Sequence, residues 1–99
     1  MQLVKNKPIR IKGSALRKLH EEVYELDGGN CVLCGVGIPE GTPAHHVNHG
    51  KNKEDVKENM VMLDDRCHRE AHFGNDPQAI KFICKLYLRE RDKDNKWNK

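Results

Sequence analysis

Two short cysteine-bearing segments constrain this chain more than any other feature of its sequence. Cys31 and Cys34 form a CVLC segment followed directly by glycine, and Cys67 closes a DDRC segment further along. Two thiolates at the CxxC spacing can bind one cation while the residues between them form a tight turn, which is the usual half-site of a structural zinc. We therefore predict a structural zinc site with Cys31, Cys34 and Cys67 as ligands.

The fourth ligand of this site has two candidates. Asp64 lies where a second CxxC half-site would carry its other cysteine, and zinc accepts a carboxylate oxygen. Cys84 is the rival, but it falls in a helical pattern, and cysteine is among the most buried residue types. We favour Asp64. Thiol redox proteins also use a CxxC pair, but they carry it in a strand-to-helix unit of a parallel sheet, which this sequence does not predict.

A metal site would compensate for a small hydrophobic core. The chain has 99 residues, of which 36% are hydrophobic and 33% charged. A domain of this size is only marginally stable without a cross-link such as a disulfide or a bound metal ion. No apolar run approaches the roughly 20 residues that cross a bilayer, and the N-terminus carries no signal-peptide pattern. We expect a single domain over residues 1–99 in a reducing cytoplasm, and exclude a membrane protein, a multidomain enzyme and a large cofactor-binding fold.

The net charge of +3 is divided unevenly along the chain. Residues 1–26 carry six basic and three acidic side chains, residues 27–80 carry five and nine, and residues 81–99 carry seven and three. Basic flanks around an acidic, histidine-rich centre suit a cation site that works beside a polyanion.

The segments before the cysteines predict an edge strand and a helix. Ile9 and Ile11 alternate with basic residues in the first dozen positions, and Pro8 would keep this strand at an edge. Ser14 is the expected N-cap of a helix that ends near Leu26, before two glycines. Its apolar positions recur at helical spacing, at Leu16, Leu19, Val23 and Leu26.

A second long helix is expected over residues 77–91, with Asp76 as N-cap and Pro77 at the first helical position. Its inner face would carry Ile80, Ile83, Cys84 and Tyr87. We expect a frayed tail over 92–99. The motif-bearing core spans about 27–74, with Val61 and Leu63 alternating in a short strand and a short helix beginning near His68.

Four histidines form a second group of candidate functional residues, after the predicted zinc ligands. His68 and His72 are four residues apart, so on a helix they project from the same side and can share a metal. His45 and His46 are adjacent, so on a strand they point to opposite faces. One can join the metal while the other stays free to accept a proton, an arrangement suited to metal-assisted hydrolysis. We expect the two other histidines, His20 and His49, to be solvated bystanders.

The strings AHHV, ENMVML and CHREAH resemble the HNH endonucleases, whose ββα-metal unit carries a His, an Asn and a His in this order. The segments DGGNC, CVLCG and the cysteine directly before His68 resemble the zinc-stabilised phage and bacterial branch of that family. The resemblance covers about residues 14–73. It implies an α+β fold, a small ββα-metal core with a zinc knuckle, flanked by an N-terminal and a C-terminal helix.

The resemblance also implies a role for each matched residue. His45, His68 and His72 look like ligands of a catalytic divalent cation, and His46 looks like the general base that activates water. Asn59 would pin the loop that orients the base. The implied reaction is hydrolysis of DNA phosphodiester bonds to 5′-phosphate and 3′-hydroxyl ends. One active site per chain addresses one strand, so we expect nicking.

For the catalytic cation, the resemblance favours Mg²⁺ or Mn²⁺, and a histidine-rich site also suits Ni²⁺ or Zn²⁺. The expected partner is DNA, in a bacterial or phage-infected host cell. A homodimer and an association with phage packaging machinery stay open. Candidate DNA contacts are basic side chains near the motif, namely Arg66, Arg69, Lys51 and Lys53. The alternative function is a zinc-stabilised DNA-binding module without catalysis.

Overall fold

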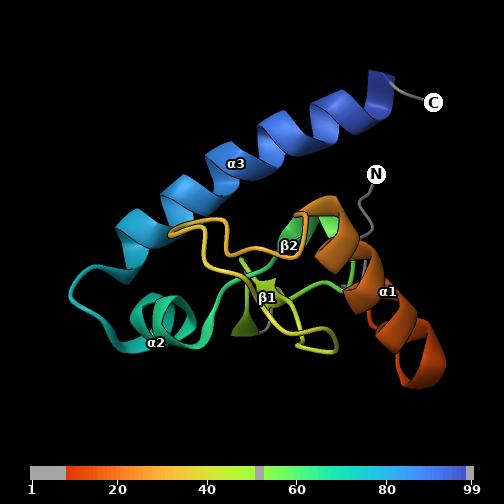
Figure 1. Cartoon of the computed structure of the whole chain (residues 1–99), viewed down its shortest axis with the longest axis horizontal. Helices are drawn as coiled ribbons and strands as arrows, with labels where there is room; N and C mark the ends of the chain where they lie inside the picture. Colours follow the sequence, from red (N-terminus) through yellow and green to blue (C-terminus); the bar gives the residue numbers. More distant parts are fainter. Residues whose placement is uncertain (1–8, 51–52, 98–99) are drawn as a thin grey trace, which may run out of the picture.

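The computed structural model describes residues 9–50 and 53–97. It is a small α+β structure in which two short strands pair between helices, as the sequence predicts at the level of fold class. Figure 1 shows the strands near the centre, with α1 on the right, α2 on the left and α3 above them. The elements in chain order are α1 (Gly13–Leu26), β1 (His45–His46), the 3-10 helix η2 (Lys57–Asn59), β2 (Met60–Val61), α2 (Asp65–Phe73) and α3 (Pro77–Trp97).

The two strands are antiparallel, with His45 opposite Val61 and His46 opposite Met60. A pair this short is not stable alone, so it depends on the helices packed against it. Both α1 and α3 contact β2. By pairing with β2, strand β1 holds His45 and His46 at fixed positions, and α2 follows β2 after a short connection.

The chain around β2 is buried on both faces. Val61 and Leu63 were expected to alternate with exposed neighbours in a strand, but the strand ends at Val61, and all residues from Met60 to Leu63 are buried. Apolar and polar residues alternate along a strand only when one face of the sheet is exposed to solvent. Here helices cover the strand from more than one direction, so the pattern is a continuous apolar run.

The N-terminal segment differs from its prediction. The expected edge strand is absent from residues 9–12, and residues 1–8 lie outside the described part of the chain. Instead, the Asp55 N–H donates to the Ile9 carbonyl at 2.8 Å, and Arg10 Nε donates to the Lys53 carbonyl at 2.7 Å. These contacts run along a loop rather than a strand, so no sheet ladder forms.

Helix α1 begins one residue before the predicted cap. Its N-cap is Lys12, in extended backbone and without a side-chain capping bond, so Ser14 lies inside the first turn. Lys12 has an extended backbone, and the chain turns at Gly13, whose φ of +65° suits glycine. The other end is as predicted: the Gly29 N–H donates to the Tyr24 carbonyl at 2.9 Å, with φ +71° at Gly29.

Helix α3 starts as predicted and ends later. Asp76 Oδ1 accepts from the Ala79 N–H at 3.1 Å, which caps the helix. The frayed tail expected over 92–99 is wrong for residues 92–97, because the helix continues through Trp97; residues 98–99 lie outside the described part of the chain. No glycine or proline interrupts this charged segment, so no residue in it has a strong tendency to break the helix.

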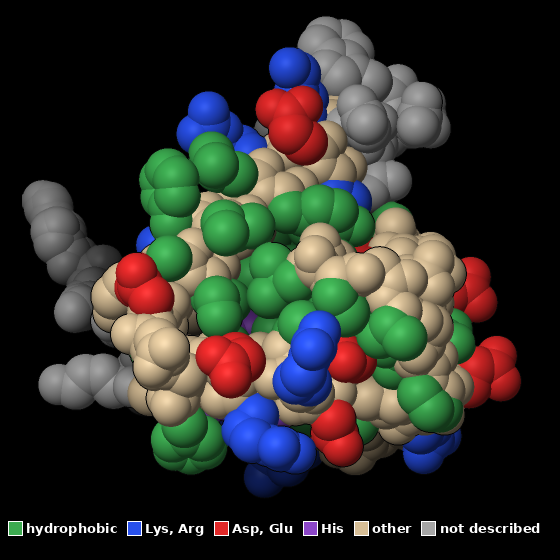
Figure 2. All heavy atoms as spheres, turned by 60° about the vertical axis from the view of Figure 1, so that its left-hand side comes forward, with side chains coloured by type: hydrophobic (Ala, Val, Ile, Leu, Met, Phe, Trp, Pro, Cys, Tyr) green, Lys and Arg blue, Asp and Glu red, His purple; other side chains and the backbone are tan. Residues whose placement is uncertain are grey.

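The buried face of α3 is also shifted from its prediction. Ile83, expected to face inward, is 49% exposed, whereas Leu88 and Arg91 are buried. The residues that face inward follow helical spacing, at Ile80, Cys84, Tyr87, Leu88 and Arg91. Figure 2 shows hydrophobic side chains on the surface, and the exposed ones on α2 and α3 are Phe73, Phe82, Ile83 and Leu86. Within the described residues, no helix has the length and apolar character needed to cross a membrane.

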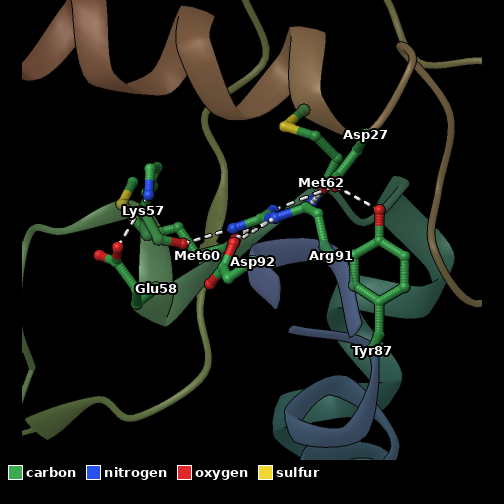
Figure 3. Close-up of polar contacts among 8 residues, drawn as sticks. All are labelled: Asp27, Lys57, Glu58, Met60, Met62, Tyr87, Arg91 and Asp92. Atoms are coloured by element: carbon green, nitrogen blue, oxygen red, sulfur yellow. Dashed lines mark hydrogen bonds and ion pairs between the residues drawn. The ribbon is translucent and has the colours of Figure 1, made fainter. Parts of the chain in front are cut away.

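Arg91 connects α3 to the chain segment around β2 (Figure 3). Its guanidinium donates to the carbonyls of Lys57 at 2.6 Å and Met60 at 3.1 Å, and forms an ion pair with Asp27 at 3.1 Å. Asp27 also accepts from the Met62 N–H at 2.8 Å and from the Tyr87 hydroxyl at 2.5 Å. This network fixes the backbone on both sides of Asn59.

Candidate functional site

The predicted zinc ligands come together. Donor atoms of Cys31, Cys34, Asp64 and Cys67 all lie within 4.8 Å of one another. The CVLC segment forms the expected tight turn, since the Gly35 N–H donates to the Cys31 carbonyl at 2.9 Å. The donor set of thiols and one carboxylate fits the chemistry that zinc prefers. This Cys₃Asp cluster is therefore compatible with a bound zinc ion.

Asp64 is held in the cluster by the start of α2. As the N-cap of α2, its Oδ1 accepts from the Cys67 N–H at 3.2 Å, and it also accepts from Cys34 Sγ at 3.6 Å. Hydrogen bonds, chiefly from the Cys67 thiol, lower the pKa of the Asp64 carboxyl to about 2. The rival ligand, Cys84, is fully buried in the hydrophobic core and outside the cluster, and burial raises the pKa of its thiol to about 11.

A second cluster joins the strand to α2. Donor atoms of His45, His68 and His72 lie within 4.8 Å of one another. Their ring centroids are 5.1 Å apart for His45 and His68, 5.2 Å for His45 and His72, and 4.8 Å for His68 and His72. The predicted geometry is thus present: two imidazoles one helical turn apart on α2 face a third from β1.

The histidine cluster is buried on one side and open on the other. His45 is buried, whereas His68 and His72 are exposed. Burial, reinforced by the neighbouring histidines, lowers the pKa of His45 to about 3. Burial likewise lowers the pKa of His68. Neutral imidazole is the form that binds metal, so the cluster fits a divalent cation with room for a further ligand on its exposed side.

His46 lies outside this cluster, as its place beside His45 on the strand requires. Its Nε2 lies 2.8 Å from Asp55 Oδ1, and the two side chains are only 15% and 5% exposed. The sequence alone does not single out Asp55, because this residue lies in the charged stretch KNKEDVKEN, which has the composition of a solvated loop. No local signal in the sequence marks it as a partner of His46.

Asn59 pins the loop between the strands. Its Oδ1 accepts from the Asn48 N–H at 2.8 Å, while its Nδ2 donates to the carbonyls of Asn48 at 3.1 Å and Glu54 at 3.0 Å. The side chain is buried and uses both ends of its amide. These contacts tie the loop that carries Asp55 to the residue directly before β2.

The two histidines expected to be bystanders have neighbours in the site. His20 is half-buried, and its Nδ1 accepts from the Ala44 N–H at 2.9 Å, so it anchors the chain just before β1. His49 is exposed, as expected, but its ring centroid lies 5.1 Å from that of His72. The sequence around these two histidines did not indicate the contact of His20 with Ala44 or that of His49 with His72, because both contacts depend on how the loops fold back.

The four basic residues proposed for DNA contact differ in placement. Arg66 and Arg69 are exposed on α2, the helix that carries two of the clustered histidines. Lys53 is half-buried beside Arg10. Lys51 lies outside the described residues. Among the described candidates, the two arginines therefore share α2 with His68 and His72, and Arg66 lies close to Cys34 of the cysteine cluster.

Comparisons of the chain with protein-family models, curated proteins and solved structures find no match.

Proposed function

We propose that this protein is a metal-dependent endonuclease of the HNH type that hydrolyses phosphodiester bonds in DNA. The observation that carries the proposal is the convergence of His45 from β1 with His68 and His72 from α2. Three protein ligands with an open side are typical of catalytic metal sites, whereas four closed ligands are typical of structural ones. The Cys₃Asp cluster, with its four donors, corresponds to the structural type.

The residues of the histidine cluster would hold one divalent cation. When bound, such a cation supplies Lewis-acid stabilisation of the charge that develops on the phosphate and on the leaving oxygen. Because His68 and His72 are exposed while His45 is buried, the phosphate would approach from the α2 side.

His46 would act as the general base. Its imidazole is on the strand next to a metal ligand but is held by Asp55 rather than by the cluster, so it remains available to accept a proton from water. Asn59 would not touch the substrate; it fixes the loop that carries Asp55. The products would be 5′-phosphate and 3′-hydroxyl ends, and a single site per chain would nick one strand.

Arg66 and Arg69 would contact the DNA backbone. A planar guanidinium matches two phosphate oxygens, and both side chains are exposed on the helix that carries His68 and His72. The grip would be independent of sequence and would weaken steeply with added salt.

The experiment combines metal binding with cleavage in one matched pair of variants. His72→Ala removes a cluster ligand, and Phe73→Ala changes the next residue of α2, which is 84% exposed. We expect His72→Ala to lose calorimetric Mn²⁺ binding and relaxation of supercoiled plasmid, and Phe73→Ala to keep both. If the wild-type protein binds DNA but does not cleave it in any divalent metal, the result would support the non-catalytic binding module instead.

A further inference from the structure

Asp55 is a buried carboxylate that bonds on both of its oxygens. Oδ1 lies 2.8 Å from His46 Nε2, and Oδ2 accepts from the Ile11 N–H at 2.9 Å. The side chain is 5% exposed. Burial alone would raise the pKa of this carboxyl, but the hydrogen bonds from Ile11 and His46 outweigh it and leave the pKa below its ordinary value. Asp55 is therefore ionised at neutral pH.

We propose that Asp55 is a positioning residue that holds His46 in the tautomer protonated at Nε2, so that Nδ1 is the atom that accepts the proton from water. This inference rests on the proposed nuclease function for its catalytic consequence. The tautomer itself is a structural claim that stands without it.

The tautomer follows from the donors and acceptors present. An ionised carboxylate only accepts hydrogen bonds, so the short contact to Asp55 requires a proton on Nε2. A neutral imidazole carries one ring proton, which leaves a lone pair on Nδ1. Among the described residues, Nδ1 of His46 has no hydrogen-bond partner. It is therefore the ring atom that remains available for a water molecule.

The N-terminal segment fixes the direction of the carboxylate. The Ile11 N–H donates to one oxygen, and the Asp55 backbone N–H donates to the Ile9 carbonyl at 2.8 Å. Arg10 Nε adds a bond to the Lys53 carbonyl at 2.7 Å. Residues 9–11 thus hold the loop and the carboxylate together, which aims the remaining oxygen at His46.

This arrangement predicts what an amide would do at position 55. Asn has one acceptor oxygen where Asp has two. The Ile11 N–H cannot become an acceptor, so it should retain the amide oxygen, leaving the NH₂ group to face His46. The imidazole can adapt by moving its proton to Nδ1. Asp55→Asn is therefore expected to invert the tautomer while preserving the shape of the site.

The experiment reads the tautomer and the reaction separately. Long-range ¹H–¹⁵N NMR distinguishes protonated from unprotonated ring nitrogens, and His46→Gln assigns the His46 signals. We expect protonated Nε2 in the full-length wild type and protonated Nδ1 in Asp55→Asn. Plasmid relaxation should fall by about 10²–10⁴-fold in kcat, with KM changed by less than about 3-fold. Asp76→Asn, an equally conservative change at an exposed helix cap, should alter neither.

The outcomes separate the two claims. Wild-type His46 protonated at Nδ1, or a tautomer unchanged by Asp55→Asn, would overturn the positioning role whether or not the protein cleaves DNA. If Asp55→Asn inverted the tautomer of His46 but left kcat unchanged, the proposed contribution of the tautomer to catalysis would be overturned. Absence of cleavage in the wild type would overturn the nuclease function while the NMR result still decides the tautomer.

Discussion

Arg91 and Asp27 form a buried ion pair that joins α3 to the end of α1. Their charged atoms are 3.1 Å apart, and the side chains are 5% and 0% exposed. The same guanidinium donates to the carbonyls of Lys57 and Met60, which bracket Asn59 (Figure 3). The long C-terminal helix therefore does more than cover the core, because it fixes the backbone that positions the loop of the candidate site.

Removing Arg91 should destabilise the protein strongly. Arg91→Leu leaves the Asp27 carboxylate buried beside only neutral donors and leaves two carbonyls without their donor. Loss of one partner of a buried pair costs about 3–5 kcal/mol. Urea unfolding of the zinc-loaded protein measures this. Arg89→Leu, at an exposed position of the same helix, should change the free energy of unfolding by less than about 0.5 kcal/mol; similar values for both variants would contradict the role of the pair.

Cys34 should be needed for metal binding by the Cys₃Asp cluster, whereas Cys84 should not. Cobalt bound by thiolates gives charge-transfer absorption that histidine sites lack, so cobalt loading reports this cluster alone. Cys34→Ser removes an exposed ligand and is expected to abolish tight binding and lower the melting temperature. Cys84→Ala should keep the absorption, because Cys84 lies in the apolar core. Full thiolate absorption in Cys34→Ser would exclude the assigned ligand set.

Asn59 should control the order of the described loop residues 47–50 and 53–56. Asn59→Ala leaves the N–H and carbonyl of Asn48 and the carbonyl of Glu54 without their partner. Each lost buried hydrogen bond costs about 1–3 kcal/mol when the remaining group is unsatisfied. Hydrogen exchange of the loop amides should accelerate, while zinc binding by the Cys₃Asp cluster should match that of the wild type. Asn75→Ala, in an exposed position, is the control; unchanged protection in Asn59→Ala would refute the pinning role.

Asp55 should make stability depend on pH in the acid range. Its pKa in the folded protein lies below the ordinary value of 3.8. A depressed pKa contributes stability that is fully present above 3.8 and is lost as the pH falls through the folded value. The difference in unfolding free energy between wild type and Asp55→Asn should therefore be largest above pH 3.8 and shrink as the pH falls below it. If the difference in unfolding free energy between the two proteins grew as the pH fell, the result would contradict the lowered pKa of Asp55.

The sequence predicted the parts of the site that depend on local spacing. The CxxC turn and the i, i+4 pair His68 and His72 need only a turn and a helix to bring their donors together, so their clustering followed from spacing alone. Asp55 and Arg91 could not be predicted in this way. Both lie in charged stretches that read as solvent-facing, and their partners are brought to them by long-range packing.

Cleavage of supercoiled plasmid by wild type and by His46→Ala tests directly whether His46 acts as a general base in a metal-dependent nuclease. We expect the wild type to convert the plasmid to nicked circles in Mg²⁺ or Mn²⁺ and not in EDTA. His46→Ala should cleave at least about 100-fold more slowly, because a general base contributes about 10²–10⁴-fold, while its zinc content and melting temperature match the wild type. Equal relaxation by the two proteins, or none by the wild type in any divalent metal, would contradict the assignment of His46 beside a catalytic metal centre.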